Sequence, residues 1–323
     1  MKRTIAITAA NGRLGHAVSQ LLLERQNPEI TLRFTARDPN KVSALRGQIL
    51  RADFDDPATM KVAFAGVDTL LLISGMGSNE DRIRQHRAAI ACAKEAGVKR
   101  IVYTSFTHSV PGSRFIWAGA QVDAEKCLRA SGLAYTILRN NQYFANLDMF
   151  LEQARDTGVF SMPGMEGKVA YVSHADLAAA TVEVLLGTGH ENRIYELTGP
   201  EALDGRMIAA ALSKGLHKEI QVKPCPPEAL RSAMAAKGTP VFVIDALLSL
   251  YEAAGAGEYK TVSGDLPMLI HRPAQSLLEQ LAKRTFPDLW AAPKPRPAKA
   301  PAVPIPMLRS ISKHGNRSHT RHH

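Results

Sequence analysis

Short apolar runs alternate with stretches of helical periodicity along most of this chain, and this alternation restricts the possible folds more than any other feature. The run DTLLLIS at 68–74 is apolar almost throughout, which is typical of a strand covered on both faces. Other apolar or β-rich runs, predicted as strands, lie at 5–8, 31–36, 48–52, 100–105, 133–139 and 192–199. Between them, apolar residues recur at helical spacing.

Strands that alternate with helices form β-α-β units, which build a parallel sheet with helices on both faces. We therefore predict an α/β fold with a Rossmann-like, doubly wound parallel sheet in residues 1–150. Beyond residue 150 the alternation loosens, and helices are predicted at 173–186, 200–216 and 226–238. We expect residues 151–286 to form a smaller α/β lobe on the substrate side, over the carboxyl ends of the strands, where open sheets bind ligands.

Residues 287–323 differ in composition from the rest of the chain. They hold seven of the 19 prolines and carry +6 of the formal net charge of +10. Such a segment is too polar and too rich in proline to build a core, so we predict a disordered basic tail. The remaining charge is modest, and nucleic acid is not an expected partner.

No apolar run approaches the roughly 20 residues that a membrane-spanning helix needs. The apolar start of the chain is interrupted at Asn11 and Gly12, before any signal-peptide core, so we expect a cytoplasmic protein. The cysteines Cys92, Cys127 and Cys225 are widely spaced and form no Cys-x-x-Cys pair. This pattern indicates reduced thiols and no metal site.

The segment TAANGRLG, residues 8–15, follows the first predicted strand and opens a helix. Gly12 stands where a pyrophosphate must approach the main chain, and Gly15 where helix and strand pack closely. Ala9 replaces the first glycine of such loops and is tolerable there if its φ is negative. The alternative is a plain tight turn. We predict an NAD(P)-binding loop in which the cofactor contacts Ala9, Asn11, Gly12, Arg13, Leu14 and Gly15.

The end of the second predicted strand reads FTARDPNK and carries Arg37 where an acidic residue would bind a ribose hydroxyl. An arginine there accommodates a 2′-phosphate through paired hydrogen bonds, and Lys41 adds a second positive charge. Arg13 is within reach of the same phosphate. Asp38 is expected to point away or to pair with Lys41. We predict NADP (NADPH) as the cofactor; the alternative is that Arg37 is a solvated charge.

Seven segments together resemble the NmrA-like atypical short-chain dehydrogenases: TAANGRLG, TARDPNK, RADFDDP, GVDTLLLIS, AKEAGVKRIVYTS, AEKCLRASGLAYTILRNNQYFANL and HENRIYELTG. Within that family the chain is most similar to NADPH-dependent quinone oxidoreductases and triphenylmethane reductases, from about residue 3 to about 286. The resemblance implies further cofactor contacts at Asp53, Ser74, Gly75, Met76, Gly77, Thr104, Asn140, Asn141, Tyr143 and Phe144. Asp53 is equally well explained as a turn or helix-cap carboxylate.

Typical short-chain dehydrogenases use a serine, a tyrosine and a lysine. The resemblance places these positions at Ser105, Trp117 and Gln121, and neither Trp117 nor Gln121 can donate a proton usefully. Reduction of a quinone or another conjugated acceptor tolerates this loss, because it needs little beyond positioned hydride delivery and takes its proton from water. The same loss fits an NADP-sensing regulator without catalysis.

The residues predicted to act on the acceptor are Ser105, Trp117, Gln121 and Tyr143, with Asn141 beside them. Trp117 and Tyr143 either stack on a planar acceptor or are core aromatics, and Gln121 either binds the ligand or lies on a helix surface. His108 is a weaker candidate proton donor, whereas His86 is expected to be packed. We expect a small-molecule acceptor and a monomer or homodimer, with no membrane partner.

Overall fold

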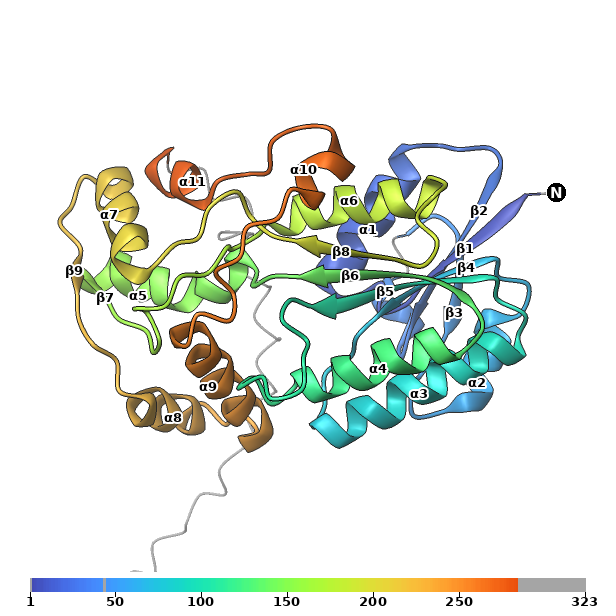
Figure 1. Ribbon diagram of the computed structural model, residues 1–323, viewed down its shortest axis with the longest axis horizontal. Coiled ribbons are helices and arrows are strands. Elements are labelled where there is room, and N and C mark those ends of the chain that lie inside the picture. Colours follow the sequence, from blue (N-terminus) through green and yellow to red (C-terminus); the bar gives the residue numbers. More distant parts are fainter. Residues whose placement is uncertain (1, 43–44, 284–323) are drawn as a thin grey trace, which may run out of the picture. The chain divides into compact units, whose positions relative to one another are not determined.

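A seven-stranded parallel sheet forms the centre of the computed structural model, which describes residues 2–42 and 45–283 (Figure 1). The strand order in this described part is β3-β2-β1-β4-β5-β6-β8. The strands are β1 (Arg3–Ile7), β2 (Ile30–Ala36), β3 (Gln48–Arg51), β4 (Thr69–Ile73), β5 (Arg100–Phe106), β6 (Ala134–Asn140) and β8 (Arg193–Leu197). The predicted α/β fold is confirmed. The tail predicted at 287–323 lies outside the described residues.

The strand order reverses between β1 and β4. The chain runs outward from β1 through β2 to β3 and then returns to place β4 on the other side of β1. Such a reversal leaves a crevice at the carboxyl ends of the two central strands. The Thr8 hydroxyl joins these ends, because it donates to the carbonyl of Leu71 (3.0 Å) and accepts the N–H of Ile73 (2.8 Å).

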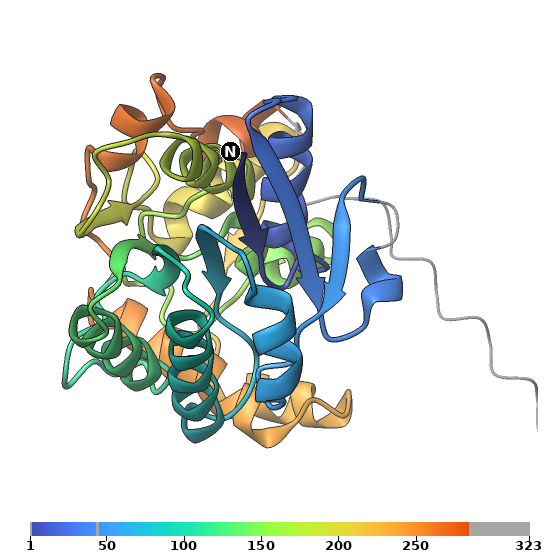
Figure 2. The ribbon, with the colours of Figure 1, turned by 90° about the vertical axis from the view of Figure 1, so that its right-hand side faces the viewer.

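Helices cover both faces of the sheet (Figures 1 and 2). One layer contains α1 (Arg13–Glu24), α6 (His174–Leu186) and α10 (Asp265–Ile270). The other contains α2 (Pro57–Phe64), α3 (Asn79–Glu95) and α4 (Ala118–Ala130). Leu70, Leu71 and Leu72 of β4 are fully buried, as expected for a strand that is apolar towards both layers.

Side-chain caps explain where several helices begin. Asp56 accepts the N–H of Ala58 (3.2 Å) and Pro57 occupies the first turn of α2, two features that favour a helix start. The helix predicted at 200–216 begins later, as α7 (Gly205–Leu216). Leu203 pairs with Val169 in a β-bridge and Asp204 is the N-cap, so residues 200–203 are not helical.

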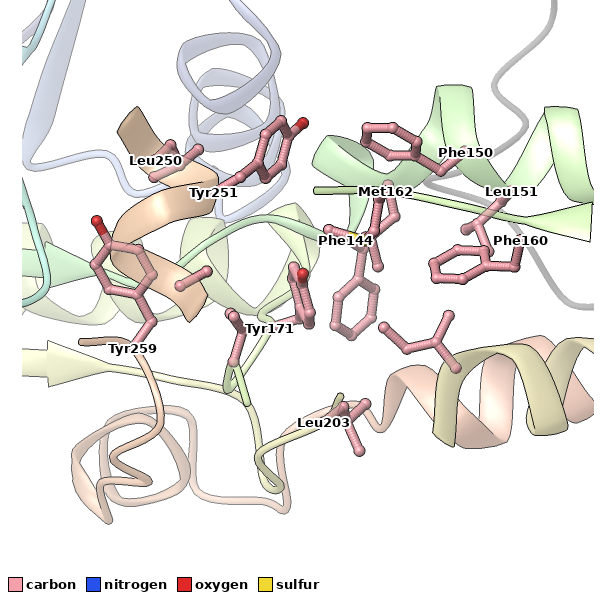
Figure 3. Packing of buried hydrophobic residues seen from close by; sticks show 14 of the residues in the cluster. Phe144, Phe150, Leu151, Phe160, Met162, Tyr171, Leu203, Leu250, Tyr251 and Tyr259 are labelled. Carbon is pink, nitrogen blue, oxygen red and sulfur yellow. The ribbon is translucent and has the colours of Figure 1, made fainter. Parts of the chain in front are cut away.

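A second group of elements lies beyond the carboxyl ends of β5, β6 and β8. In Figure 1 the arrowheads of these three strands point towards this group. It comprises α5 (Asp148–Thr157), α7, α8 (Pro227–Ala236), α9 (Val241–Gly255), α11 (Leu277–Lys283) and the paired strands β7 (Val159–Phe160) and β9 (Gln221–Val222). Figure 3 shows its core, in which Phe144, Tyr171 and Tyr259 are buried. Residues after 150 also supply the strand β8 to the main sheet and the helix α6 to the layer that contains α1.

A buried carboxylate links α6 to the segment after α10. Asp176 is fully buried and accepts hydrogen bonds from the Arg272 guanidinium (2.6 Å) and the N–H of Gln275 (2.7 Å). Because a buried charge needs compensation, these contacts hold the late segment against the first helix layer. None of the helices in the described residues is both long and apolar enough to span a bilayer.

Candidate active site

The loop after β1 holds one strained residue. Ala9 has a φ of 49°, in the left-handed region, so the condition of a negative φ, under which alanine is tolerable here, is not met. The neighbouring hydrogen bonds enforce this conformation: the N–H of Ala10 binds the carbonyl of Thr35 (3.0 Å), and the N–H of Gly12 binds the carbonyl of Ala9 (2.8 Å). An alanine in this region costs on the order of 1–2 kcal/mol, which the surrounding contacts must offset.

The two glycines of the loop have different surroundings. A Cβ on Gly15 would lie 2.3 Å from the carbonyl oxygen of Ala9, whereas one on Gly12 would lie 3.3 Å from the same atom. Gly12 precedes α1, and no side chain in the described residues caps this helix. The first N–H groups of α1 therefore remain available to an anion, and the helix dipole favours negative charge there.

Arg37 follows β2 directly and is exposed, and no carboxylate among the described residues pairs with it. Asp38 accepts the N–H of Asn40 (3.1 Å) and so stabilises the 3-10 turn that carries Lys41, rather than pairing with Lys41. The free guanidinium and the exposed Lys41 give the end of β2 an unpaired positive charge. Arg13, by contrast, forms an ion pair with Asp148 (3.4 Å).

Asp53 serves the turn between β3 and α2. Its carboxylate accepts the N–H of Asp55 (3.1 Å) and its own N–H binds the hydroxyl of Thr59 (3.0 Å), while Arg51 lies 3.7 Å away. This is the turn role that the sequence left open. Contact with adenine stays a prediction.

Ser74 connects the ends of β4 and β5. Its N–H binds the hydroxyl of Thr104 (3.2 Å), and its own hydroxyl accepts from Arg82 (2.7 Å) and contacts His86 (2.9 Å). The segment 75–77 continues from there towards α3, and Met76 is 67% exposed. The predicted cofactor segment 74–77 is therefore anchored at Ser74 and open beyond it.

In the segment that begins at the end of β6, some side chains make contacts within the protein and others leave polar atoms without a partner among the described residues. The buried Asn140 amide makes no hydrogen bond of good geometry within the described residues, although its contact with the Tyr143 hydroxyl lowers the pKa of Tyr143. The Asn141 amide donates to the carbonyl of Tyr259 (3.0 Å), and the Phe144 ring belongs to the lobe core. The Tyr143 ring packs against His174 with a centroid distance of 4.5 Å. The Asn140 amide and the equally buried Gln142 amide, which also has no partner among the described residues, are thus the side chains here that most need a ligand.

Two residues predicted to act on the acceptor are hydrogen-bonded inside the protein. Gln121 is buried rather than on a helix surface and accepts from the hydroxyl of Tyr103. The Ser105 hydroxyl donates to Glu125 (2.7 Å), a carboxylate that also binds Arg139 (2.7 Å). Both contacts join a residue of β5 to a residue of α4. Catalytic roles for Ser105 and Gln121 stay predictions.

The Glu125 network makes the fold sensitive to acid. Burial alone would raise the pKa of Glu125, but hydrogen bonds from Arg139 and Ser105 outweigh it and hold the pKa below its ordinary value. Its stabilising effect is therefore full above the ordinary glutamate pKa of about 4.3 and is lost as pH falls further. We expect Glu125→Gln to lower the free energy of unfolding at pH 7 by about 2 kcal/mol and to flatten its acid dependence, as measured by urea titration across pH.

Glu95→Gln is the matched control, because Glu95 forms an exposed pair with Lys61 at 2.8 Å. Its effect should stay within roughly 0.5 kcal/mol. Equal behaviour of the two variants would show that the buried network does not stabilise the fold.

A positively charged side chain, that of Arg82, lies over the ring of Trp117. The guanidinium carbon of Arg82 lies 4.6 Å from the ring centroid, and Phe115 packs beside the ring at 6.0 Å. His86, one turn after Arg82, is fully buried, and burial together with the Arg82 charge lowers its pKa to about 4. His86 is packed, as expected. The sequence patterns did not identify Arg82 as a candidate site residue, although it lies four residues before His86 on the buried side of α3.

These features can be compared with known proteins. A model of the NmrA-like family matches residues 1–297. This chain belongs to the NmrA-like family. It is 36% identical to quinone oxidoreductase 2 of Escherichia coli over 86% of this chain and 97% of that protein, and 31% identical to an NAD(P)H azoreductase of Xenophilus azovorans over 85% and 96%.

Solved structures agree with this membership of the NmrA-like family. The Citrobacter sp. triphenylmethane reductase complexed with NADP(H) superposes with a TM-score of 0.79 at 30% identity, covering 87% of this chain and 99% of that one. The Escherichia coli quinone oxidoreductase complexed with NADPH gives 0.79 at 35% identity, covering 86% and 98%. NmrA, a negative transcriptional regulator, shares the fold at 17% identity with a TM-score of 0.72.

Proposed function

We propose that this NmrA-like protein is an NADPH-dependent oxidoreductase that delivers a hydride to a quinone or similar conjugated acceptor without a Tyr/Lys acid pair. The observation that carries the proposal is the combination of an uncapped α1 N-terminus behind Gly12 with the unpaired Arg37 at the end of β2. Relatives above 30% identity are named for quinone and azo reduction, which supports the same chemistry.

The residues at the carboxyl ends of the strands fit the parts of this cofactor. The N–H groups of α1 would bind the diphosphate, and Arg37 with Lys41 would bind the 2′-phosphate. Segment 74–77 and the buried Asn140 amide would line the nicotinamide end. When bound, the dihydronicotinamide supplies the hydride.

The proposed acceptor class rests on the absence of the tyrosine and lysine acid pair from its two expected positions. Trp117 and Gln121 stand where related dehydrogenases have their tyrosine and lysine, and neither replaces a proton donor. A simple ketone would become an alkoxide with no acid beside it. A quinone becomes a resonance-stabilised anion that water can protonate, so the site suits that acceptor better.

A panel assay tests this function. Purified protein is mixed with NADPH or NADH and a series of quinones, and loss of the dihydronicotinamide absorbance is followed. We expect turnover with at least one quinone and preference for NADPH. Tight NADPH binding with no turnover on any acceptor would instead support a non-catalytic NADP(H)-sensing regulator, which the missing acid pair also permits. Absence of binding to either dinucleotide would contradict both functions.

A further inference from the structure

Arg82 is a buried cation that pairs with no carboxylate of the described residues. It lies on α3 and is 5% exposed, and its buried Nε has no hydrogen-bond partner in the part of the chain that the structure describes. Among the described residues its one side-chain hydrogen bond goes to the Ser74 hydroxyl (2.7 Å). Burial lowers its pKa from the usual arginine value. An uncompensated buried charge is costly, so such a group points to a missing anionic partner.

Arg100, the other buried arginine among the described residues, does not share this situation. Arg100, 6% exposed, donates to the carbonyls of Val184 (2.9 Å) and Leu185 (3.2 Å) and lies 3.6 Å from Glu191. Those contacts tie the sheet to the end of α6 and explain its burial. Within residues 2–42 and 45–283, Arg82 has no comparable carbonyl or carboxylate partners.

The position of Arg82 places it at the edge where ligands bind. Ser74 follows β4, and Trp117 stands immediately before α4. Tyr143 follows β6; burial raises its pKa, whereas the Asn140 side chain and, to a smaller extent, the Arg82 charge lower it. The guanidinium therefore lies among the ends of β4, β5 and β6. The cation–π contact, with the guanidinium carbon 4.6 Å from the Trp117 ring centroid, does not neutralise this charge.

We propose that Arg82 is a catalytic residue that touches the acceptor and stabilises the negative charge the acceptor gains with the hydride, so that the site selects acceptors that become anions. This inference rests on the proposed function. It defines the substrate class more narrowly: neutral or anionic conjugated acceptors are favoured, and cationic ones are disfavoured by like charge.

The chemistry balances for both classes of acceptor. A quinone receives two electrons and one hydrogen from the dihydronicotinamide, one C=O π bond opens, and the product is a hydroquinone monoanion that takes a proton from water. A cationic triarylmethane dye receives the same hydride at its central carbon and becomes neutral. Negative charge develops only in the first reaction, so a nearby guanidinium assists only that one.

The test replaces the charge and compares the two acceptors. Arg82→Met keeps a long side chain on Trp117 without the cation, and Arg87→Met is its matched control, since Arg87 lies on the same helix with a 62% exposed side chain paired to Asp123. We expect Arg82→Met to lower the ratio of quinone kcat/KM to dye kcat/KM about 100-fold or more, with NADPH Kd unchanged within about twofold. Arg87→Met should leave all three quantities unchanged.

Equal losses on both acceptors, or an unchanged quinone rate, would overturn the role of Arg82. If Arg82→Met fails to fold, Arg82→Lys and Arg82→Gln provide the comparison: Lys should retain a higher quinone-to-dye ratio than Gln, and equal ratios would overturn the role. A wild-type protein that reduces no acceptor would refute the proposed function itself.

Discussion

Arg37→Asp should weaken NADPH binding about 100-fold while leaving NADH binding within roughly threefold of the wild type. Arg37 is exposed at the end of β2, and no carboxylate among the described residues pairs with it. Its guanidinium is therefore free to form paired hydrogen bonds with a 2′-phosphate, and an aspartate would repel that phosphate. NADH lacks the 2′-phosphate, so its affinity should not depend on Arg37. Isothermal titration with each dinucleotide measures both affinities.

Arg206→Asp makes the same change of charge on α7, where Arg206 is also exposed. It should leave both affinities unchanged, because α7 belongs to the lobe and not to the strand end. A parallel loss of NADPH and NADH affinity in Arg37→Asp would mean that the arginine does not read the 2′-phosphate. No loss at all would place the phosphate elsewhere.

Gly15→Ala should cost the fold more than about 3 kcal/mol and abolish measurable NADPH binding. The added Cβ would lie 2.3 Å from the carbonyl oxygen of Ala9, 3.0 Å from its carbonyl carbon and 3.1 Å from the Cα of Ala10. All three atoms are backbone and cannot rotate away, so α1 must move off the β1 loop. Thermal unfolding and NADPH titration measure the two losses.

Gly12→Ala separates stability from ligand binding. Gly12 has a φ of −79°, which alanine adopts readily, and its added Cβ would meet one atom at 3.3 Å. We expect its melting temperature to stay within a few degrees of wild type while NADPH affinity falls about tenfold, because the methyl group intrudes where the diphosphate approaches. If Gly15→Ala proved as stable as Gly12→Ala, the close packing at Gly15 would not matter.

The main sheet was predictable because its signals are local. The apolar run of β4 and the Asp56–Pro57 start of α2 each depend on a few neighbouring residues. The glycine loop and Arg37 belong to the same kind of signal, since a strand, a turn and a charge follow one another in the sequence. These parts of the candidate site were named by motif spacing alone.

Other elements depend on contacts distant in sequence. The helix α9 begins with Val241 and Phe242 in a run that suits a strand as well as a helix, and packing in the lobe decides between them. The positive φ of Ala9 is enforced by hydrogen bonds to neighbouring segments, which no local pattern reveals. Each of these features became visible only in the folded chain.

The polar contacts of the site are of the same non-local kind. Ser105 and Gln121 were placed by resemblance, and no local pattern shows that Ser105 bonds to Glu125 or that Gln121 bonds to Tyr103. Arg82 became a candidate because three strand ends meet around it. Sequence motifs therefore name the glycine loop and Arg37, whereas the surroundings of Arg82, Ser105 and Gln121 depend on contacts distant in sequence.

The bond between Asp176 and Arg272 has a consequence for biosynthesis. The carboxylate is fully enclosed, yet the arginine that neutralises it lies 96 positions later in the chain. A ribosome that has translated all seven strands of the main sheet has not yet supplied that arginine. Nascent chains shorter than this point would hold an enclosed negative charge with nothing to offset it, so completion of the native state must wait until almost the whole described polypeptide has emerged.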